Sequence, residues 1–213
     1  MLGVYMKYSS ACEKTRAEFS KDVFFSMREF FRFAVPSAGM VCLEWWSFEG
    51  LILLSGLLPN PELETSVLSL CLTITNLQYY IPYGFAATAS TRVSNELGAG
   101  NAQAAKVTVE AIMVLVVAEM VFLAMILFFC HLVLGYAFSS KKEIVDRIAD
   151  MGPLLCLSII MDGLQAVLSG VARGSGWQDI GAYVNLGAYY LVGVPVGVVL
   201  AFVVHLKGKG LWI

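Results

Sequence analysis

Charged residues are scarce in this sequence of 213 residues. Asp, Glu, Lys and Arg make up 14% of it, against about 25% in an ordinary soluble domain. The formal net charge is only −2, so the chain lacks the basic excess with which proteins bind nucleic acid. Hydrophobic residues instead reach 58%, and the mean hydropathy is +0.74. This composition predicts a protein whose main solvent is the lipid bilayer.

The sequence also lacks the motifs of several other classes of protein. Its 5 cysteines include no CxxC pair, and His131 and His205 have no partner at ligand spacing, so we expect neither a disulfide framework nor a metal site. Its glycines form no GxxxxGK[ST] loop, so ATP-driven transport is not supported. Because no catalytic triad or cofactor motif can be assembled, we expect a protein that is not an enzyme and has no cofactor.

About five hydrophobic runs are long enough to cross a hydrocarbon core of about 30 Å as helices. They end at residues that interrupt helices, such as Pro59-Asn60-Pro61 and Gly98-Ala99-Gly100. The predicted spans are 36–58, 66–90, 108–136, 151–172 and 180–206. The sequence therefore predicts an all-α integral membrane protein with a partial transmembrane bundle over 36–213.

Residues 1–35 differ from the rest of the chain in mixing charges with aromatic rings. The first seven residues read as the end of a preceding helix. Lys14–Phe33, which includes Phe24 and Phe25, predicts a helix along the membrane interface that leads into the first span. A plain charged linker is the alternative. Lys and Arg are more numerous on this side of the membrane than on the other, which predicts a cytosolic location for the segment.

Carboxylates inside the hydrophobic runs are the candidate functional groups. A charged side chain at the bilayer centre costs about 2.5–3.5 kcal/mol on insertion scales, so such residues usually face a bundle interior or an aqueous cavity. No Lys or Arg lies in mid-span to pair with them. The four acids are Glu44, Glu49, Glu119 and Asp162. Desolvation favours the neutral form of a carboxyl group, so these residues can bind a proton, a metal cation or a cationic substrate.

Helical periodicity ranks Glu44 and Asp162 ahead of the other two acids. Glu44 shares a face with Ser37, Ser47 and Ser55, whereas Glu49 points about 140° away. Asp162 shares a helix face with Gln165 and Ser169. Polar stripes also occur on the span 66–90, with Ser69, Thr73, Asn76, Tyr80 and Tyr83, and on the span 180–206, with Asn185 and Tyr189. The stripes predict one shared aqueous cavity, and interhelical hydrogen bonds are the alternative.

Glycines four residues apart on one helix predict places where two helices approach closely. Gly170 with Gly174, and Gly193 with Gly197, form GxxxG steps.

Several stretches of the sequence resemble one family of membrane proteins. STRVSNELGAGN, at 90–101, is similar to the signature after the eighth helix of plant MATE (multidrug and toxic compound extrusion) transporters. VCLEWWSFE at 41–49 and LLSGLLPNP at 53–61 resemble the seventh helix and its following turn. LQAVLSGVARG at 164–174 and IGAYVNLG at 180–187 resemble the tenth and eleventh helices.

The resemblance implies helices seven to eleven of a twelve-helix, two-lobed antiporter. Such a protein exchanges H⁺ or Na⁺ for organic or xenobiotic compounds across the plasma or vacuolar membrane. The family's coupling acids fall on Glu44 and Asp162, with Glu49 and Glu119 as secondary acids. Ser47, Asn76, Tyr80, Tyr83, Gln165, Asn185 and Tyr189 would line the cavity that receives the small organic substrate.

By the same comparison, the N-terminal lobe and the twelfth helix are missing from this chain. A transport-inactive, truncated membrane protein is therefore the alternative to an exporter. An intramembrane enzyme with Glu44 and Asp162 as an acid–base pair has little support, because no nucleophile or metal cluster accompanies them.

Overall fold

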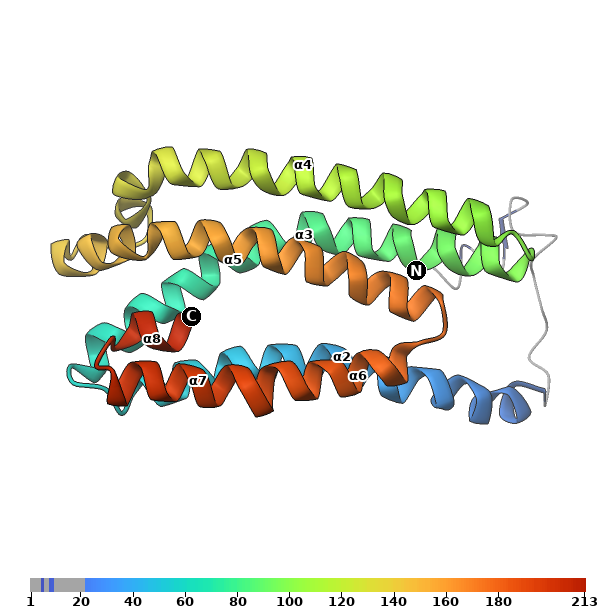
Figure 1. The fold of residues 1–213 in the computed structure, drawn as a ribbon, viewed down its shortest axis with the longest axis horizontal. Helices are drawn as coiled ribbons and strands as arrows, with labels where there is room; N and C mark the ends of the chain where they lie inside the picture. Colours follow the sequence, from blue (N-terminus) through green and yellow to red (C-terminus); the bar gives the residue numbers. More distant parts are fainter. Residues whose placement is uncertain (1–4, 6–7, 10–21) are drawn as a thin grey trace. The chain divides into compact units, whose positions relative to one another are not determined.

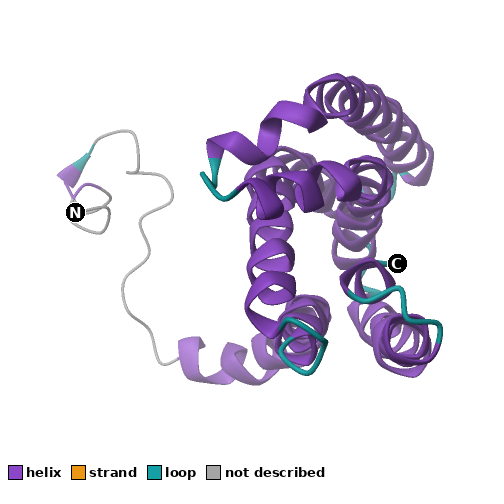
Figure 2. Cartoon of the chain, turned by 90° about the vertical axis from the view of Figure 1, so that its left-hand side faces the viewer, coloured by secondary structure: helices purple, strands orange, loops and turns teal. Residues whose placement is uncertain are grey.

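The computed structural model describes Tyr5, residues 8–9 and residues 22–213. These residues form helices joined by short connections, and no strand occurs among them (Figures 1 and 2). The all-α prediction is confirmed. The chain divides into two compact units, Met1–Val35 and Pro36–Ile213, and the helix bundle belongs to the second unit.

Four long helices account for most of the described chain. They are α2 (Asp22–Ser55), α3 (Pro61–Gly98), α4 (Ala102–Leu134) and α5 (Lys142–Gly174). Their ends fall at the predicted interruptions, with α3 beginning at Pro61 and ending at Gly98. The helices extend beyond the predicted spans because a hydropathy run ends where polar residues begin. The backbone can continue its hydrogen-bonded helix into that polar layer.

The predicted span over 180–206 corresponds to one helical stretch, Gln178–Val203, in which α and π hydrogen bonding alternate. It consists of α6 (Gln178–Asn185), the π-helical segment η3 (Leu186–Gly193), α7 (Val194–Val198) and a second π-helical segment, η4 (Val199–Val203). A short helix, α8 (Gly208–Trp212), follows, and the 3₁₀ turn η2 (Gly135–Ala137) joins α4 to α5. Pro195, which has no N–H to donate, lies where the hydrogen bonding changes from the π form of η3 to the α form of α7.

The described part of the predicted interfacial helix is not a separate element. Residues 22–33 belong to α2, which continues through Pro36. Phe24, Phe25 and their neighbours Phe30 and Phe31 are exposed. The remainder of that prediction, 14–21, lies outside the described residues, as does the predicted helix end over 1–7 apart from Tyr5, which is helical.

Four helical stretches among the described residues, rather than the five predicted, are long and apolar enough to cross a membrane. They are Phe24–Ser55, Ala102–Ala137, Lys142–Gly174 and Gln178–Val203. The exception is α3, which is long but carries Glu62, Glu64 and a series of Ser, Thr, Asn and Gln residues. The face that α3 buries against α4 and α5 is mainly apolar, and most of its polar residues lie on the exposed or half-buried side of the helix.

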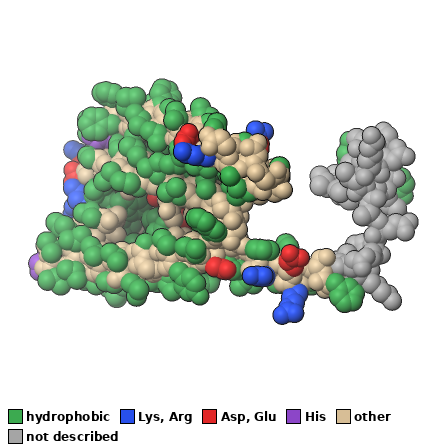
Figure 3. All heavy atoms as spheres, turned by 45° about the vertical axis from the view of Figure 1, so that its right-hand side comes forward, with side chains coloured by type: hydrophobic (Ala, Val, Ile, Leu, Met, Phe, Trp, Pro, Cys, Tyr) green, Lys and Arg blue, Asp and Glu red, His purple; other side chains and the backbone are tan. Residues whose placement is uncertain are grey.

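The core of the bundle lies between α3, α4 and α5. Cys71 from α3, Val116 and Met120 from α4, and Leu155 and Val167 from α5 are each fully buried. The outer face of α4 is apolar and exposed, as is expected for a surface in contact with lipid. Figure 3 shows hydrophobic side chains over most of the visible face.

Glycines allow α5 to approach α3 closely. A Cβ at Gly170 would overlap the carbonyl group of Ala86, and one at Gly174 would lie 2.6 Å from the carbonyl oxygen of Ser90. The predicted close approach at this GxxxG step is therefore confirmed. The step at Gly193 and Gly197 differs, since a Cβ at Gly197 would lie 3.5 Å from its nearest neighbours, at ordinary contact distance.

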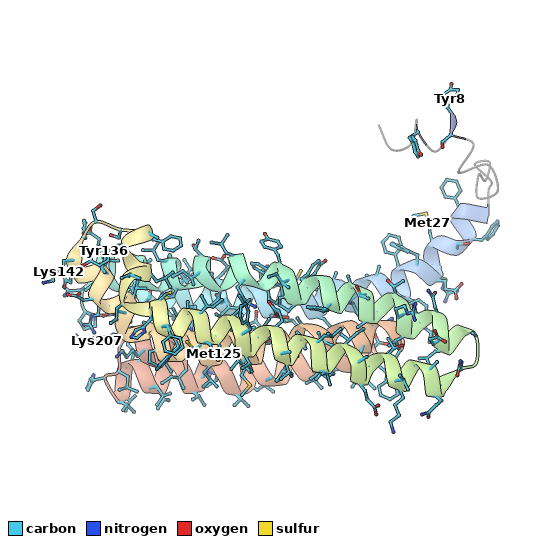
Figure 4. The ribbon with its side chains drawn as sticks, turned by 90° about the horizontal axis from the view of Figure 1, so that it is seen from above. Tyr8, Met27, Met125, Tyr136, Lys142 and Lys207 are labelled. Atoms are coloured by element: carbon cyan, nitrogen blue, oxygen red, sulfur yellow. The ribbon has the colours of Figure 1, made fainter. Side chains whose placement is uncertain are left out.

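Charged side chains are paired at the end of the bundle that carries Lys142 and Lys207 (Figure 4). Glu64 is 6% exposed. One of its carboxylate oxygens accepts a hydrogen bond from the Gly208 backbone N–H at 3.0 Å, and the other lies 3.9 Å from the Arg147 guanidinium. This buried carboxylate thereby ties α3 to α5 and to the start of α8.

Substitution of Gly170 by Ala should destabilise the bundle by about 1–3 kcal/mol, since the added methyl group meets backbone rather than a flexible side chain. Gly84→Ala is the matched control, because a Cβ at Gly84 meets nothing within 4 Å. Thermal unfolding in detergent, followed by size-exclusion fluorescence, should show a lower midpoint for Gly170→Ala alone. Equal midpoints for the two variants would contradict the packing argument.

Candidate functional site

Glu44 and Asp162, the two acids that the sequence ranks highest, border the same small cavity. The cavity has a volume of about 20 Å³, which is room for about one water molecule. Its walls come from three helices: Glu44, Trp45 and Phe48 on α2; Leu72, Thr75, Asn76 and Tyr79 on α3; and Asp162 on α5. The predicted convergence of polar helix faces thus places both carboxyl groups at one point.

Neither carboxyl group has a hydrogen-bond or ion-pair partner among the described residues. Glu44 is 8% exposed, and Asp162 is partly buried. The two groups are close enough to repel each other when both are ionised. Arg173, at the end of α5, is near enough to attract Glu44 electrostatically without forming an ion pair with it. A bound proton or cation would remove the repulsion between the two acids.

A larger cavity of about 650 Å³ adjoins the small one. Phe48 and Asp162 line both cavities. The other walls of the larger cavity are mainly apolar and come from α2, α5, α6, η3, α7 and the C-terminal residues. The polar members are Ser47, Ser158, Gln165, Asn185 and Tyr189. Its size and composition are those of a pocket for a small organic molecule. Figure 3 shows a hollow among hydrophobic side chains.

Aromatic rings link the helices around the two cavities. Trp45 and Tyr79 meet edge to face, with ring centroids 6.2 Å apart. Phe48 and Tyr189 lie 6.4 Å apart across the larger cavity. Aromatic faces beside carboxyl groups form surroundings that attract organic cations.

Two side-chain amides in the wall of the larger cavity connect the helices around it. Gln165 Nε2 donates a hydrogen bond to Asn185 Oδ1 at 3.0 Å. Asn185 Nδ2 in turn donates to the backbone carbonyl oxygen of Met40, also at 3.0 Å. These bonds join α5 to α6 and α6 to α2.

Glu49 and Glu119, the secondary acids, lie apart from both cavities. Glu49 is exposed on α2 and lines neither one. Both carboxyl oxygens of Glu119, on α4, are buried and have no hydrogen-bond partner. The structure thus brings Glu44 and Asp162 together and leaves the other two acids outside that site.

The face of α3 that lines the small cavity is not the polar face that the sequence predicts, although the two faces share Asn76. Asn76 lines the cavity, but Tyr80 is 71% and Tyr83 52% exposed, and neither lines either cavity. Tyr79 is in the wall instead. A second periodic signal was present in the sequence, because the cavity residues Leu72, Thr75, Asn76 and Tyr79 follow helical i, i+3, i+4 and i+7 spacing.

Trp45 and Phe48 line the small cavity but are absent from the residues that the sequence indicated. Both rings belong to a stretch rich in aromatic residues. Trp45 and Trp46 are adjacent and of the same type, so only the orientation of the helix determines that Trp45 lines the cavity and Trp46 is exposed. No group of three or more His, Cys, Asp or Glu residues within the described part of the chain could hold a metal ion.

Comparison with known proteins gives one consistent result. The MatE family model matches residues 36–199. Arabidopsis thaliana Protein DETOXIFICATION 3 is 61% identical over 212 residues, and Protein DETOXIFICATION 14 is 57% identical over 213 residues. Each alignment covers 100% of this chain and 44% of the relative. The chain therefore spans less than half the length of these relatives.

A solved structure agrees with the sequence relatives. The crystal structure of the eukaryotic MATE transporter AtDTX14 matches with a TM-score of 0.95 at 57% identity, covering 99% of this chain and 47% of that one. Since the family model covers most of the residues and the fold agrees over nearly all of them, the chain belongs to the MATE family of membrane transporters.

Proposed function

We propose that this chain forms part of a secondary-active exporter that exchanges H⁺ or Na⁺ for small organic compounds. The observation that carries the proposal is the pair of unpartnered carboxyl groups, Glu44 and Asp162, on a cavity of about 20 Å³ that adjoins one of about 650 Å³. The names of the relatives, DETOXIFICATION proteins and a MATE transporter, support the same function.

The proposed mechanism is a competition between ion and substrate for the same negative site. The coupling ion binds at Glu44 and Asp162 and lowers the negative charge of the pair, which weakens the attraction for a cationic substrate in the adjoining cavity. When the ion leaves, the two acids repel each other and a cation is again favoured. Because Phe48 and Asp162 line both cavities, either occupant changes the surroundings of the other.

The substrate would lie in the larger cavity, between apolar walls and a few polar side chains. Ser47, Gln165, Asn185 and Tyr189 border it, while Asn76 faces the ion site. We place the exporter in the plasma or vacuolar membrane of a plant cell. Glu49 and Glu119 are proposed as secondary acids outside the main site.

Neutralising either coupling acid should abolish gradient-driven efflux. We would fuse this chain to the remaining part of Arabidopsis DETOXIFICATION 14 in place of its matching region, and test Glu44→Gln and Asp162→Asn in proteoliposomes. Imposing a pH gradient and a Na⁺ gradient separately identifies the ion. Each variant should fall to the rate of protein-free vesicles, because a neutral amide cannot exchange the ion.

The control for this experiment is Glu110→Gln, which removes an exposed carboxylate that pairs only with Lys106, 3.8 Å away on the same helix. Efflux by Glu110→Gln should match that of the unsubstituted fusion. Unchanged coupled efflux in both Glu44→Gln and Asp162→Asn would refute the roles assigned to these residues.

Removing the aromatic ring between the two cavities should weaken substrate binding. Phe48→Ala is expected to raise the KM for ethidium, an aromatic cation, by about three- to tenfold, the effect of losing one aromatic contact. Trp46→Ala is the matched control, since Trp46 is 64% exposed and lines neither cavity. A KM that rises equally in both variants would place the substrate elsewhere.

A further inference from the structure

The helix that carries Glu44 has few polar links to the rest of the bundle. Among the described residues, two side-chain hydrogen bonds join α2 to another helix. One, between the hydroxyls of Ser55 and Thr65 at 2.9 Å, lies at the end of α2 next to the turn into α3. The other is the bond from Asn185 to the Met40 carbonyl, and it lies one helical turn before Glu44.

Asn185 is placed so that both of its amide groups are used. Its oxygen accepts from Gln165, and its nitrogen donates to Met40. The residue is 2% exposed, so its side chain is held between helices. With both groups engaged and buried, the amide has little capacity left for a substrate.

The two ends of this amide chain lie beside the two coupling acids. Gln165 is three residues after Asp162 on α5, which places the two on the same helix face. In an α-helix the carbonyl oxygen of residue 40 accepts the N–H of residue 44. The Met40 oxygen, with two lone pairs, can accept both the Glu44 backbone N–H and the Asn185 side chain. The hydrogen-bonded chain therefore runs from the helix of Asp162 to the backbone of Glu44.

Contacts on either side of Asn185 follow the same face of α6 and η3. At Gly181, one turn earlier, a Cβ would lie 2.7 Å from the Met40 sulfur, so the helices are in contact there. At Tyr189, one turn later, the ring faces Phe48 of α2. Of these three positions that contact α2, Asn185 is the one that forms a hydrogen bond to it. Asn185 is also the last residue of α6, directly before the π-helical segment η3.

We propose that Asn185 is a positioning residue for Glu44. By bonding to Gln165 and to the Met40 carbonyl, it holds the middle of α2 against α6 and keeps the Glu44 carboxyl at the small cavity shared with Asp162. Its consequence for transport rests on the proposed function, whereas the position of α2 can be measured independently of any transport.

Two substitutions separate this role from that of a general packing residue. Asn185→Leu removes both hydrogen bonds. Asn185→Asp keeps the shape and an acceptor for Gln165 but, when ionised, has no proton to donate to Met40. When protonated, its hydroxyl can donate to that carbonyl again. Gln78→Leu is the matched control, because Gln78 donates a partly buried amide hydrogen bond to Met120, which joins α3 to α4 rather than to α2.

The position of α2 would be measured by electron–electron double resonance in proteoliposomes. Spin labels at Val41 and Ile180, which are 39% and 58% exposed, report the separation of α2 and α6. The native cysteines are replaced by Ser. In Asn185→Leu, a displaced distance population should rise about five- to tenfold relative to the native one, as expected for loss of one buried hydrogen bond. Gln78→Leu should retain the native distribution.

The pH dependence sharpens the expected result. Asn185→Asp should show the displaced population at pH 8 and lose most of it at pH 5, while Asn185→Leu should show it at both. Native distributions for both Asn185 variants at both pH values would overturn the proposal. If Asn185→Leu fails to reach the membrane, the isosteric Asn185→Asp variant carries the test.

Transport by the fusion protein then tests the consequence. Asn185→Leu should shift the pH midpoint of efflux, a change that Gln78→Leu should not produce. A displaced α2 together with an unaltered pH profile would refute the link to Glu44. Failure of the proposed function is recognised separately, by unchanged efflux in Glu44→Gln and Asp162→Asn.

Discussion

The bundle must accommodate two carboxyl groups at one cavity: Glu44 is buried and Asp162 half-buried, and neither has an ion-pair partner among the described residues. A Glu and an Asp placed in an apolar helix bundle without partners are unfavourable unless water, a proton or a cation reaches them. Three helices meet that requirement together. α2 and α5 contribute the acids, and α3 contributes Thr75, Asn76 and Tyr79 to the same cavity. The position of these three polar residues of α3 is explained by the cavity that they line.

The same chain shows how a carboxylate is treated when its role is structural. Glu64 is as buried as Glu44, but it accepts a hydrogen bond from the Gly208 N–H and lies near Arg147. A carboxylate with such partners holds elements together through charge-assisted hydrogen bonds. Glu44 and Asp162 have no such partners among the described residues, which is the difference that the proposed ion-binding role requires. The degree of burial therefore does not distinguish the structural carboxylate from the proposed coupling acids. The presence of hydrogen-bond and ion-pair partners does.

Much of the fold could be predicted from the sequence, because hydrophobic runs and the residues that interrupt helices are local signals. The pairing of Glu44 with Asp162 could also be predicted, since helical periodicity places each on a polar face. What could not be predicted depends on contacts between helices. The choice of Tyr79 over Tyr80 depends on a rotation of α3 against its neighbours. The bond from Asn185 to Met40 depends on the packing of α6 on α2, and π-helical segments interrupt the periodicity in that region.

The glycine seam between α5 and α3 has a consequence for how such a protein can diversify. At Gly170 and Gly174 the two helices meet backbone to backbone, so their separation is set by the radii of peptide groups rather than by a choice of side chains. Substitutions elsewhere along the cavity can therefore change its shape and chemistry without shifting α5 against α3. Asp162 keeps its place opposite Asn76 while the walls around it vary. Under the proposed function, one rigid frame could in this way keep the ion site unchanged while the substrate cavity varies.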